Sequence, residues 1–103
     1  MNNSMRIEPV GVAPIGSFSW ALMRLKEGAK VQRKGWNGKG MFLYYVPANE
    51  YTPCTEIAES LVNDKGLVEY GAYIAMKTAQ GNVIPWLASQ TDMLNEDWEE
   101  IRN

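Results

Sequence analysis

Histidine does not occur in this chain of 103 residues, and Cys54 is its single cysteine. Without an imidazole, acid–base catalysis near neutral pH would depend on a tuned carboxylate, lysine or tyrosine, and no pattern in the sequence points to one. Cys54 has no histidine to activate it, so we expect an inert, half-buried thiol in a chain without intrachain disulfides. We therefore predict a protein that is not an enzyme and has no catalytic residues.

Metal-binding and membrane-spanning patterns are also missing from the sequence. No Cys/His cluster has the spacing of a zinc site, and the carboxylates do not follow the spacing of a calcium loop, so we expect neither a metal nor a cofactor. No stretch approaches the roughly 20 apolar residues that cross a bilayer, and residues 1–14 lack the apolar run of a signal peptide. Together with a lone cysteine, these absences predict a cytoplasmic protein with no membrane partner.

Positive charge is unevenly distributed along the chain. The formal net charge of −2 argues against a general nucleic-acid-binding protein, which usually carries a strongly basic face, so we expect no nucleic-acid partner. From Arg24 to Lys39 there are six cations and one anion, whereas five acids and one base follow from Asp92 to the end. A basic stretch in an acidic protein fits one small anionic ligand, or contacts of opposite charge between subunits.

The length and a hydrophobic content of 46% fit one soluble globular domain. Residues 1–16 carry two prolines and no regular apolar period, so we expect a flexible N-terminal arm. Residues 17–103 then form a single α+β ligand-binding domain. It should have a small antiparallel sheet, one main N-terminal helix and a short C-terminal helix.

Capping residues place the helices of this domain. Ser17 has the character of an N-cap and Gly28 that of a left-handed C-terminal cap, so a helix is predicted over 18–27. Ser89 can cap a short helix that runs to Leu94, because acidic side chains near a helix N-terminus complement its dipole.

Alternating and apolar runs place the strands. They are expected over 30–33, 41–46, 72–77, 82–86 and 98–101, with a hairpin turn at 79–81. The span 48–70 is the hardest to interpret, because its residues follow no clear period. Within it we expect a short helix over 54–62 and a turn at 63–66.

A first signature segment combines three cations, three glycines, an indole and an amide in eight positions: Arg33-Lys34-Gly35-Trp36-Asn37-Gly38-Lys39-Gly40. Glycines let backbone N–H groups approach a ligand, cations attract anionic oxygens and an indole can stack on a base. The segment is neither a Walker loop nor a Gly-x-Gly-x-x-Gly motif. The alternative is a tight hairpin loop with Trp36 folded onto the core.

A second signature segment follows an indole with small and polar residues: Ile84-Pro85-Trp86-Leu87-Ala88-Ser89-Gln90-Thr91-Asp92. Its side chains can serve ribose hydroxyls or a base edge. The alternative is a capped helix with Trp86 in the core. We expect Asp92 and Asp97 to be surface rather than catalytic carboxylates.

Aromatic residues are abundant for so small a protein, with four Trp and five Tyr. We assign Trp20 and Trp98 to the core. Four more aromatics on predicted strands can line a pocket or a subunit interface, or pack inward: Phe42, Tyr44, Tyr45 and Tyr73.

The two signature segments closely resemble the Thoeris anti-defence family of the second type. Two further stretches share the resemblance: Ile74-Ala75-Met76-Lys77-Thr78-Ala79-Gln80-Gly81 and Met93-Leu94-Asn95-Glu96-Asp97-Trp98. The resemblance covers residues 18–101. It implies a phage sponge protein that binds glyco-cyclic ADP-ribose, the signal made by Toll/interleukin-receptor proteins of the Thoeris system, and holds it intact. It also implies a homotetramer with pockets between subunits. Cyclic dinucleotides as ligands, or an enzyme that degrades the signal, are the alternatives.

Such a ligand offers an adenine, two riboses and a pyrophosphate. We expect Trp36 or Trp86 to stack on the base, at about 1–3 kcal/mol. The pyrophosphate should be held by two cations, Arg33 and Lys39, and by the amides of Gly38 and Gly40. The remaining candidates, for riboses and base edges, are Asn37, Ser89, Gln90, Thr91 and Asp92.

Overall fold

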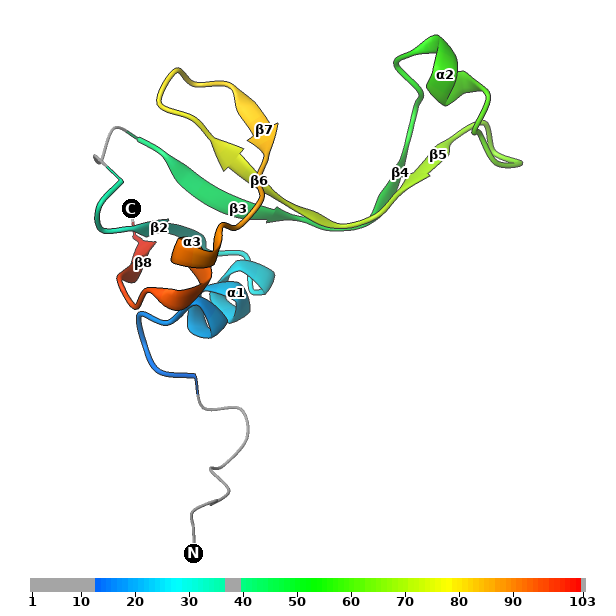
Figure 1. Cartoon of the computed structure of the whole chain (residues 1–103). Coiled ribbons are helices and arrows are strands. Elements are labelled where there is room, and N and C mark those ends of the chain that lie inside the picture. The colour runs from blue at the N-terminus through cyan, green and yellow to red at the C-terminus, as the bar shows by residue number, and fades with distance from the viewer. Residues whose placement is uncertain (1–12, 37–39, 103) are drawn as a thin grey trace, which may run out of the picture.

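The computed structural model describes residues 13–36 and 40–102, and its main feature is a five-stranded antiparallel sheet in the order β7-β6-β3-β2-β8 (Figure 1). Its strands are β2 (Lys30–Arg33), β3 (Phe42–Val46), β6 (Tyr73–Lys77), β7 (Val83–Pro85) and β8 (Trp98–Ile101). Two helices accompany this sheet, α1 (Phe18–Lys26) and α3 (Gln90–Leu94). A second sheet of β4 (Asn49–Tyr51) and β5 (Val68–Tyr70) carries the helix α2 (Glu56–Glu59). The predicted α+β class is confirmed.

Helix α1 begins at the residue that its N-cap predicts and ends within one residue of the predicted end. The Ser17 hydroxyl accepts a hydrogen bond from the Trp20 amide at 3.1 Å, and Gly28 has φ +98° just beyond the C-cap. The helix stops one residue earlier than the predicted range. Ala21 and Leu25 are fully buried on one side of it, because residues four apart share a helix face.

The core lies between α1 and one face of the sheet. Val31 is opposite Leu43, and both are fully buried beside the two α1 residues. Trp98 completes the core at 3% exposure, which confirms its assignment. Trp20 is half-buried and packs against this core. Full burial contributes about 1.5–3 kcal/mol per large aliphatic side chain, so this is the most stable part of the chain.

The opposite face of the sheet carries no helix in the described part of the chain. Successive strand residues point to opposite faces, and directly paired residues share one. Val31 and its paired residue Leu43 therefore lie on the core face. The paired residues Phe42, Lys77 and Val83 lie on the opposite face, as do Tyr44, Ala75 and Pro85. We call this second face the open face; it also includes Lys30, whose Nζ lies 5.0 Å from the Phe42 ring centroid.

The second sheet and α2 project away from the rest of the molecule (Figure 1). We call residues 48–72 the β-arm, and the described residues of 13–47 and 73–102 the head. The β-arm continues β3 and β6 outward, with Tyr51 paired to Val68. The Cα radius of gyration is 17.7 Å, against about 13 Å for a compact domain of this length.

The sequence prediction was least accurate in the β-arm. Strands β4 and β5 were not expected, and α2 is four residues long, capped by Thr55, rather than a helix over 54–62. The hairpin of β6 and β7 is confirmed, with the Thr78 amide donating to the Asn82 carbonyl at 2.9 Å.

Residues 1–12 of the predicted N-terminal arm lie outside the described residues. Gly16, at its end, is buried in the head. Its carbonyl accepts a hydrogen bond from the Trp98 amide at 3.0 Å. A Cβ at this position would lie 3.0 Å from the Glu96 carbonyl oxygen, and φ is +98°, so the position requires glycine.

Candidate functional site

Three indoles meet on the core side of the head and bring the two signature segments together. Trp36 and Trp86 lie with ring centroids 6.4 Å apart. Both pack edge-on against Trp98, at 5.5 and 6.0 Å. Phe18 closes the group, 5.6 Å from Trp98 and 6.3 Å from Trp86. Such edge-on pairs contribute about 0.5–1.5 kcal/mol each beyond their buried area. We call these four residues the tryptophan cluster.

Trp36 and Trp86 are both half-buried, unlike Trp98. Each packs against the core and is also partly exposed. The core alternative and the stacking hypothesis are thus compatible for the same side chains.

Arg33 connects the two signature segments through ion pairs. Its Nε and Nη2 donate to the two carboxylate oxygens of Asp97, at 2.9 and 3.2 Å. Its Nη1 donates to Asp92 Oδ1 at 2.9 Å, and the Arg33 side chain is only 14% exposed. These hydrogen bonds, to Asp97 first and then Asp92, raise the pKa of the guanidinium. The N–H donors of Arg33 are therefore engaged by Asp92 and Asp97 within the protein. The sequence had suggested that they contact a phosphate.

Asp92 is held from three directions. It forms a capping box with Ser89: the Ser89 amide donates to Asp92 Oδ2 at 2.9 Å, and the Asp92 amide donates to Ser89 Oγ at 3.0 Å. Burial raises the pKa of the carboxyl, but the Ser89 amide and Arg33 outweigh that effect and lower it overall. The Trp98 indole N–H donates to the Asp92 carbonyl at 2.8 Å. The predicted cap is confirmed, and it also anchors the tryptophan cluster.

Gln90 and Thr91 follow the cap on α3, and both are exposed. Among the described residues, neither side chain takes part in a hydrogen bond. Of the polar residues that the sequence proposed in this segment, these two remain available to a ligand, whereas Ser89 and Asp92 are occupied by the capping box.

The glycine-rich loop is described only at its ends. The candidates Asn37, Gly38 and Lys39 lie outside the described residues. Gly40 has φ +79°, and its carbonyl accepts a hydrogen bond from Lys77 Nζ at 3.0 Å. Lys34 is exposed at the other end of the loop, and its amide donates to the Asp97 carbonyl at 2.9 Å.

Three residues of this region were not proposed from the sequence as site residues. Lys77 reaches the loop from β6, because its strand register places it opposite Phe42. Phe18 belongs to the tryptophan cluster, and Asp97, expected at the surface, is ion-paired and 31% exposed. No local pattern indicates these contacts, since each joins segments distant in sequence.

A hollow of about 590 Å³ lies at the base of the β-arm. It is lined by Tyr51, Thr52, Cys54, Tyr70 and Tyr73. Cys54 is exposed, not half-buried. Within residues 13–36 and 40–102, no group of His, Cys, Asp or Glu is arranged to hold a metal ion. Over the same residues, no helix has the length and apolar character needed to traverse a bilayer.

Comparison with known proteins agrees with the resemblance noted from the signature segments. The family profile of the Tad2-like, Thoeris anti-defense 2-like domain matches residues 16–101. A relative, Thoeris anti-defense 2 of Bacillus phage SP01, is 37% identical over 93 aligned positions, covering 82% of this chain and 93% of the relative. The matched range includes both signature segments, the tryptophan cluster and the β-arm.

Proposed function

Because this chain belongs to the Thoeris anti-defense 2-like family, we propose that it is an anti-defence sponge that acts in the cytoplasm of the infected bacterium. It binds glyco-cyclic ADP-ribose and holds it without cleaving it. The free signal then stays too dilute to activate the Thoeris effector. Tight binding is required, and a submicromolar dissociation constant corresponds to more than about 8 kcal/mol, so several contacts must act together.

The observation that supports this proposal most directly is the meeting of the two signature segments. Trp36 and Trp86 are 6.4 Å apart, and Arg33 joins their segments through Asp92. A site made from two segments on a rigid core is pre-organised, which reduces the entropy cost of binding. The half-buried indoles supply flat apolar surface for a base, at roughly 1–3 kcal/mol per stacked base.

The polar part of the ligand would be held by the residues around the indoles. We assign the riboses and base edges to Gln90 and Thr91, with Asn37 from the first segment. The pyrophosphate is assigned to Lys39 and Lys34, with the amide of Gly38. Arg33 acts through Asp92 and Asp97, as a residue that positions the two segments.

Binding without turnover fits the chemistry of these residues. The chain has no histidine, and the carboxylates beside the indoles, Asp92 and Asp97, are fixed by Arg33. Their lowered pKa values keep both groups ionised near neutral pH. An ionised carboxylate engaged by a guanidinium is a poor general acid.

We further propose that the protein is a homotetramer with ligand pockets between subunits. One protomer leaves the indoles partly open, whereas a tight small-molecule site usually buries 70–90% of its ligand. A second protomer would supply the missing wall.

The test is recovery of the ligand. The protein is incubated with glyco-cyclic ADP-ribose, separated from free ligand, denatured by heat, and the released compound is identified by mass spectrometry. We expect the intact compound in stoichiometric amount. Release of ADP-ribose would establish the enzyme alternative instead, and binding of cyclic dinucleotides alone would establish the other sponge.

A paired substitution tests the site itself. Replacing both Gln90 and Thr91 by Ala should weaken binding about 10-fold or more, because two exposed polar contacts are removed without touching the core. Gln80→Ala, an exposed position in the β6–β7 turn, is the matched control. Isothermal calorimetry measures both variants, and equal affinity for them would exclude the α3 segment from the site.

A further inference from the structure

We propose that the β-arm of one copy packs on the open face of the sheet in a second copy, and that the second copy does the same in return. This proposal rests on the homo-oligomer included in the proposed function. It assigns the contact to two surfaces that a single chain leaves uncovered. Figure 1 shows the β-arm rising on the side away from α1, clear of the head.

The β-arm exposes more apolar surface than so small a unit can tolerate alone. Ile57 is 78% exposed and Leu61 62%, and both belong to α2 or the turn after it. The buried residues of the β-arm are Ala58 and Val68. Two three-residue strands and a four-residue helix are below the size that is stable without further packing. Further cover on the apolar side of the β-arm is therefore expected.

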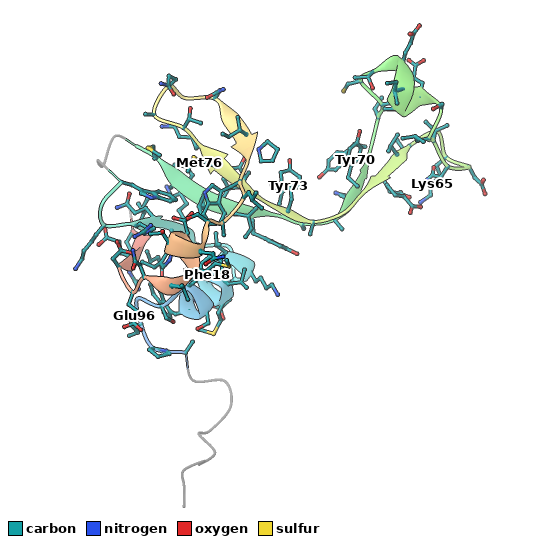
Figure 2. All side chains as sticks on the ribbon, in the orientation of Figure 1. Phe18, Lys65, Tyr70, Tyr73, Met76 and Glu96 are labelled. Carbon is teal, nitrogen blue, oxygen red and sulfur yellow. The ribbon has the colours of Figure 1, made fainter. Side chains whose placement is uncertain are left out.

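The base of the β-arm is shaped to receive a side chain. Tyr51 and Tyr70 lie with ring centroids 5.6 Å apart and line the hollow described above together with Tyr73. Figure 2 shows Tyr70 on the β-arm and Tyr73 where it leaves the head. Tyrosines of this kind are favoured in subunit interfaces, because they bury a large ring and keep a polar hydroxyl.

The open face offers a suitable partner surface. Phe42 and Tyr44 lie side by side on it, with centroids 6.2 Å apart. Lys30 and Lys77 both lie over the Phe42 ring, at 5.0 and 6.0 Å. Val83, on the same face, is 50% exposed. An open sheet face usually carries mainly polar side chains, so its aromatic and apolar content indicates a protein contact.

Charge selects this pairing over contact between two β-arms. Residues 48–72 contain five acids and one base, a balance of −4. On the open face the strand registers place two bases, Lys30 and Lys77, and one acid, Glu99. Two β-arms packed together would bring like charges into contact. The acidic β-arm against the basic open face joins unlike charges, which favours association and sets its register.

Reciprocal packing closes a pair of copies, and the proposed tetramer would contain two such pairs. A two-fold axis makes each β-arm contact the other copy's open face, so both uncovered surfaces are satisfied at once and no open chain of subunits forms. A stable interface buries roughly 1,200–2,000 Å², and a reciprocal pair of contacts buries twice the area of a single one.

The main test is the mass of the assembly in solution, measured by light scattering after size exclusion. Ile57→Asp should convert the assembly to a smaller species, because it places a charge at the centre of the apolar contact. Ile15→Asp is the matched control, since Ile15 is 84% exposed and belongs neither to the β-arm nor to a strand of the open face, and it should retain the wild-type mass. Ile57→Asp at wild-type mass would overturn the proposal.

A charge exchange tests which surfaces meet. Glu59→Lys and Lys30→Glu should each shift the assembly toward the smaller species, and the double variant should recover at least part of the wild-type mass. Absence of recovery would overturn the pairing. A monomeric wild type would do so as well, while calorimetry with glyco-cyclic ADP-ribose on that sample decides separately whether the sponge function stands.

Discussion

The head and the β-arm are built from one chain but differ in how their side chains are covered. In the head, Leu25, Val31 and Leu43 are fully buried between α1 and the sheet. In the β-arm, the buried residues Ala58 and Val68 retain 7% and 6% exposure, and most other apolar side chains face solvent. The head is therefore organised by its own core. The β-arm depends on contacts that a single chain does not make.

Ion pairs show the same contrast. In the head, the Arg33 and Asp92 side chains are each 14% exposed and share a network with Asp97 and the Ser89 cap. In the β-arm, the pair of Lys65 and Glu50 has side chains 68% and 28% exposed. Exposed pairs contribute about 0–1 kcal/mol. The head network can fix the ligand segments, whereas the β-arm pair adds little stability.

The largest expected difference between the head and the β-arm is in the stability lost when an aromatic side chain is removed. Trp98→Ala should destabilise the protein by about 3–5 kcal/mol, because it removes a 3% exposed indole and leaves a cavity. Tyr70→Ala, an aromatic truncation on the β-arm at 43% exposure, should cost under about 1 kcal/mol. Urea unfolding followed by circular dichroism measures both. Equal losses would show that the β-arm is as firmly packed as the head.

The next prediction compares the stability lost when a cation is removed from the ion pairs of the head with that lost when an exposed cation is removed. Arg33→Met should lower the unfolding free energy by about 2–3 kcal/mol, since two partly buried carboxylates lose their shared partner. It should also weaken ligand binding, because the two signature segments are no longer joined. Lys34→Met changes the same charge at an exposed neighbour and should leave stability within about 0.5 kcal/mol. Similar stability for both variants would mean that the ion pairs of Arg33 do not stabilise the fold.

The elements that the sequence predicted well are those set by local chemistry. Ser17, Gly28 and Ser89 mark helix ends because each residue satisfies backbone groups within its own turn. The strands on either side of the β6–β7 turn follow from their apolar runs. These parts of the head could be located without knowledge of the fold.

The parts that were missed depend on distant contacts. The ion pair of Arg33 was not expected, because its partner Asp97 lies 64 positions away in the sequence. In the β-arm, Asn49–Tyr51 contains Asn and Glu, which are poor strand formers, so no local preference predicts β4. Its pairing to β5 follows from the long hairpin that β3 and β6 begin.

The rate of protease cleavage tests whether assembly protects the β-arm. Lys65 lies beyond α2 with a side chain 68% exposed, and Figure 2 shows it at the far end of the β-arm. Trypsin should cleave after Lys65 about 10-fold faster in Ile57→Asp than in the wild type, because local opening is easier once the partner's cover is lost. Intact-mass spectrometry follows the products, and Ile15→Asp should be cut at the wild-type rate. Equal rates in all three proteins would mean that assembly does not protect the β-arm.

The smallest effect is a pH dependence confined to the head. The Arg33 hydrogen bonds lower the pKa of Asp97 in the folded state. A depressed folded pKa gives stability that is present above the unfolded value of about 3.9 and is lost as pH falls through the folded pKa. Asp97→Asn keeps the shape of the side chain and removes its charge, so at pH 7 it should cost about 0.5–1 kcal/mol at this partly exposed position. The difference in unfolding free energy between this variant and the wild type, here called the gap, should then disappear as pH falls below about 4. Urea titrations at pH 7, 4 and 3 measure the gap, with the exposed Glu96→Gln as control. A gap that stays constant down to pH 3 would assign the role of Asp97 to packing rather than to its charge.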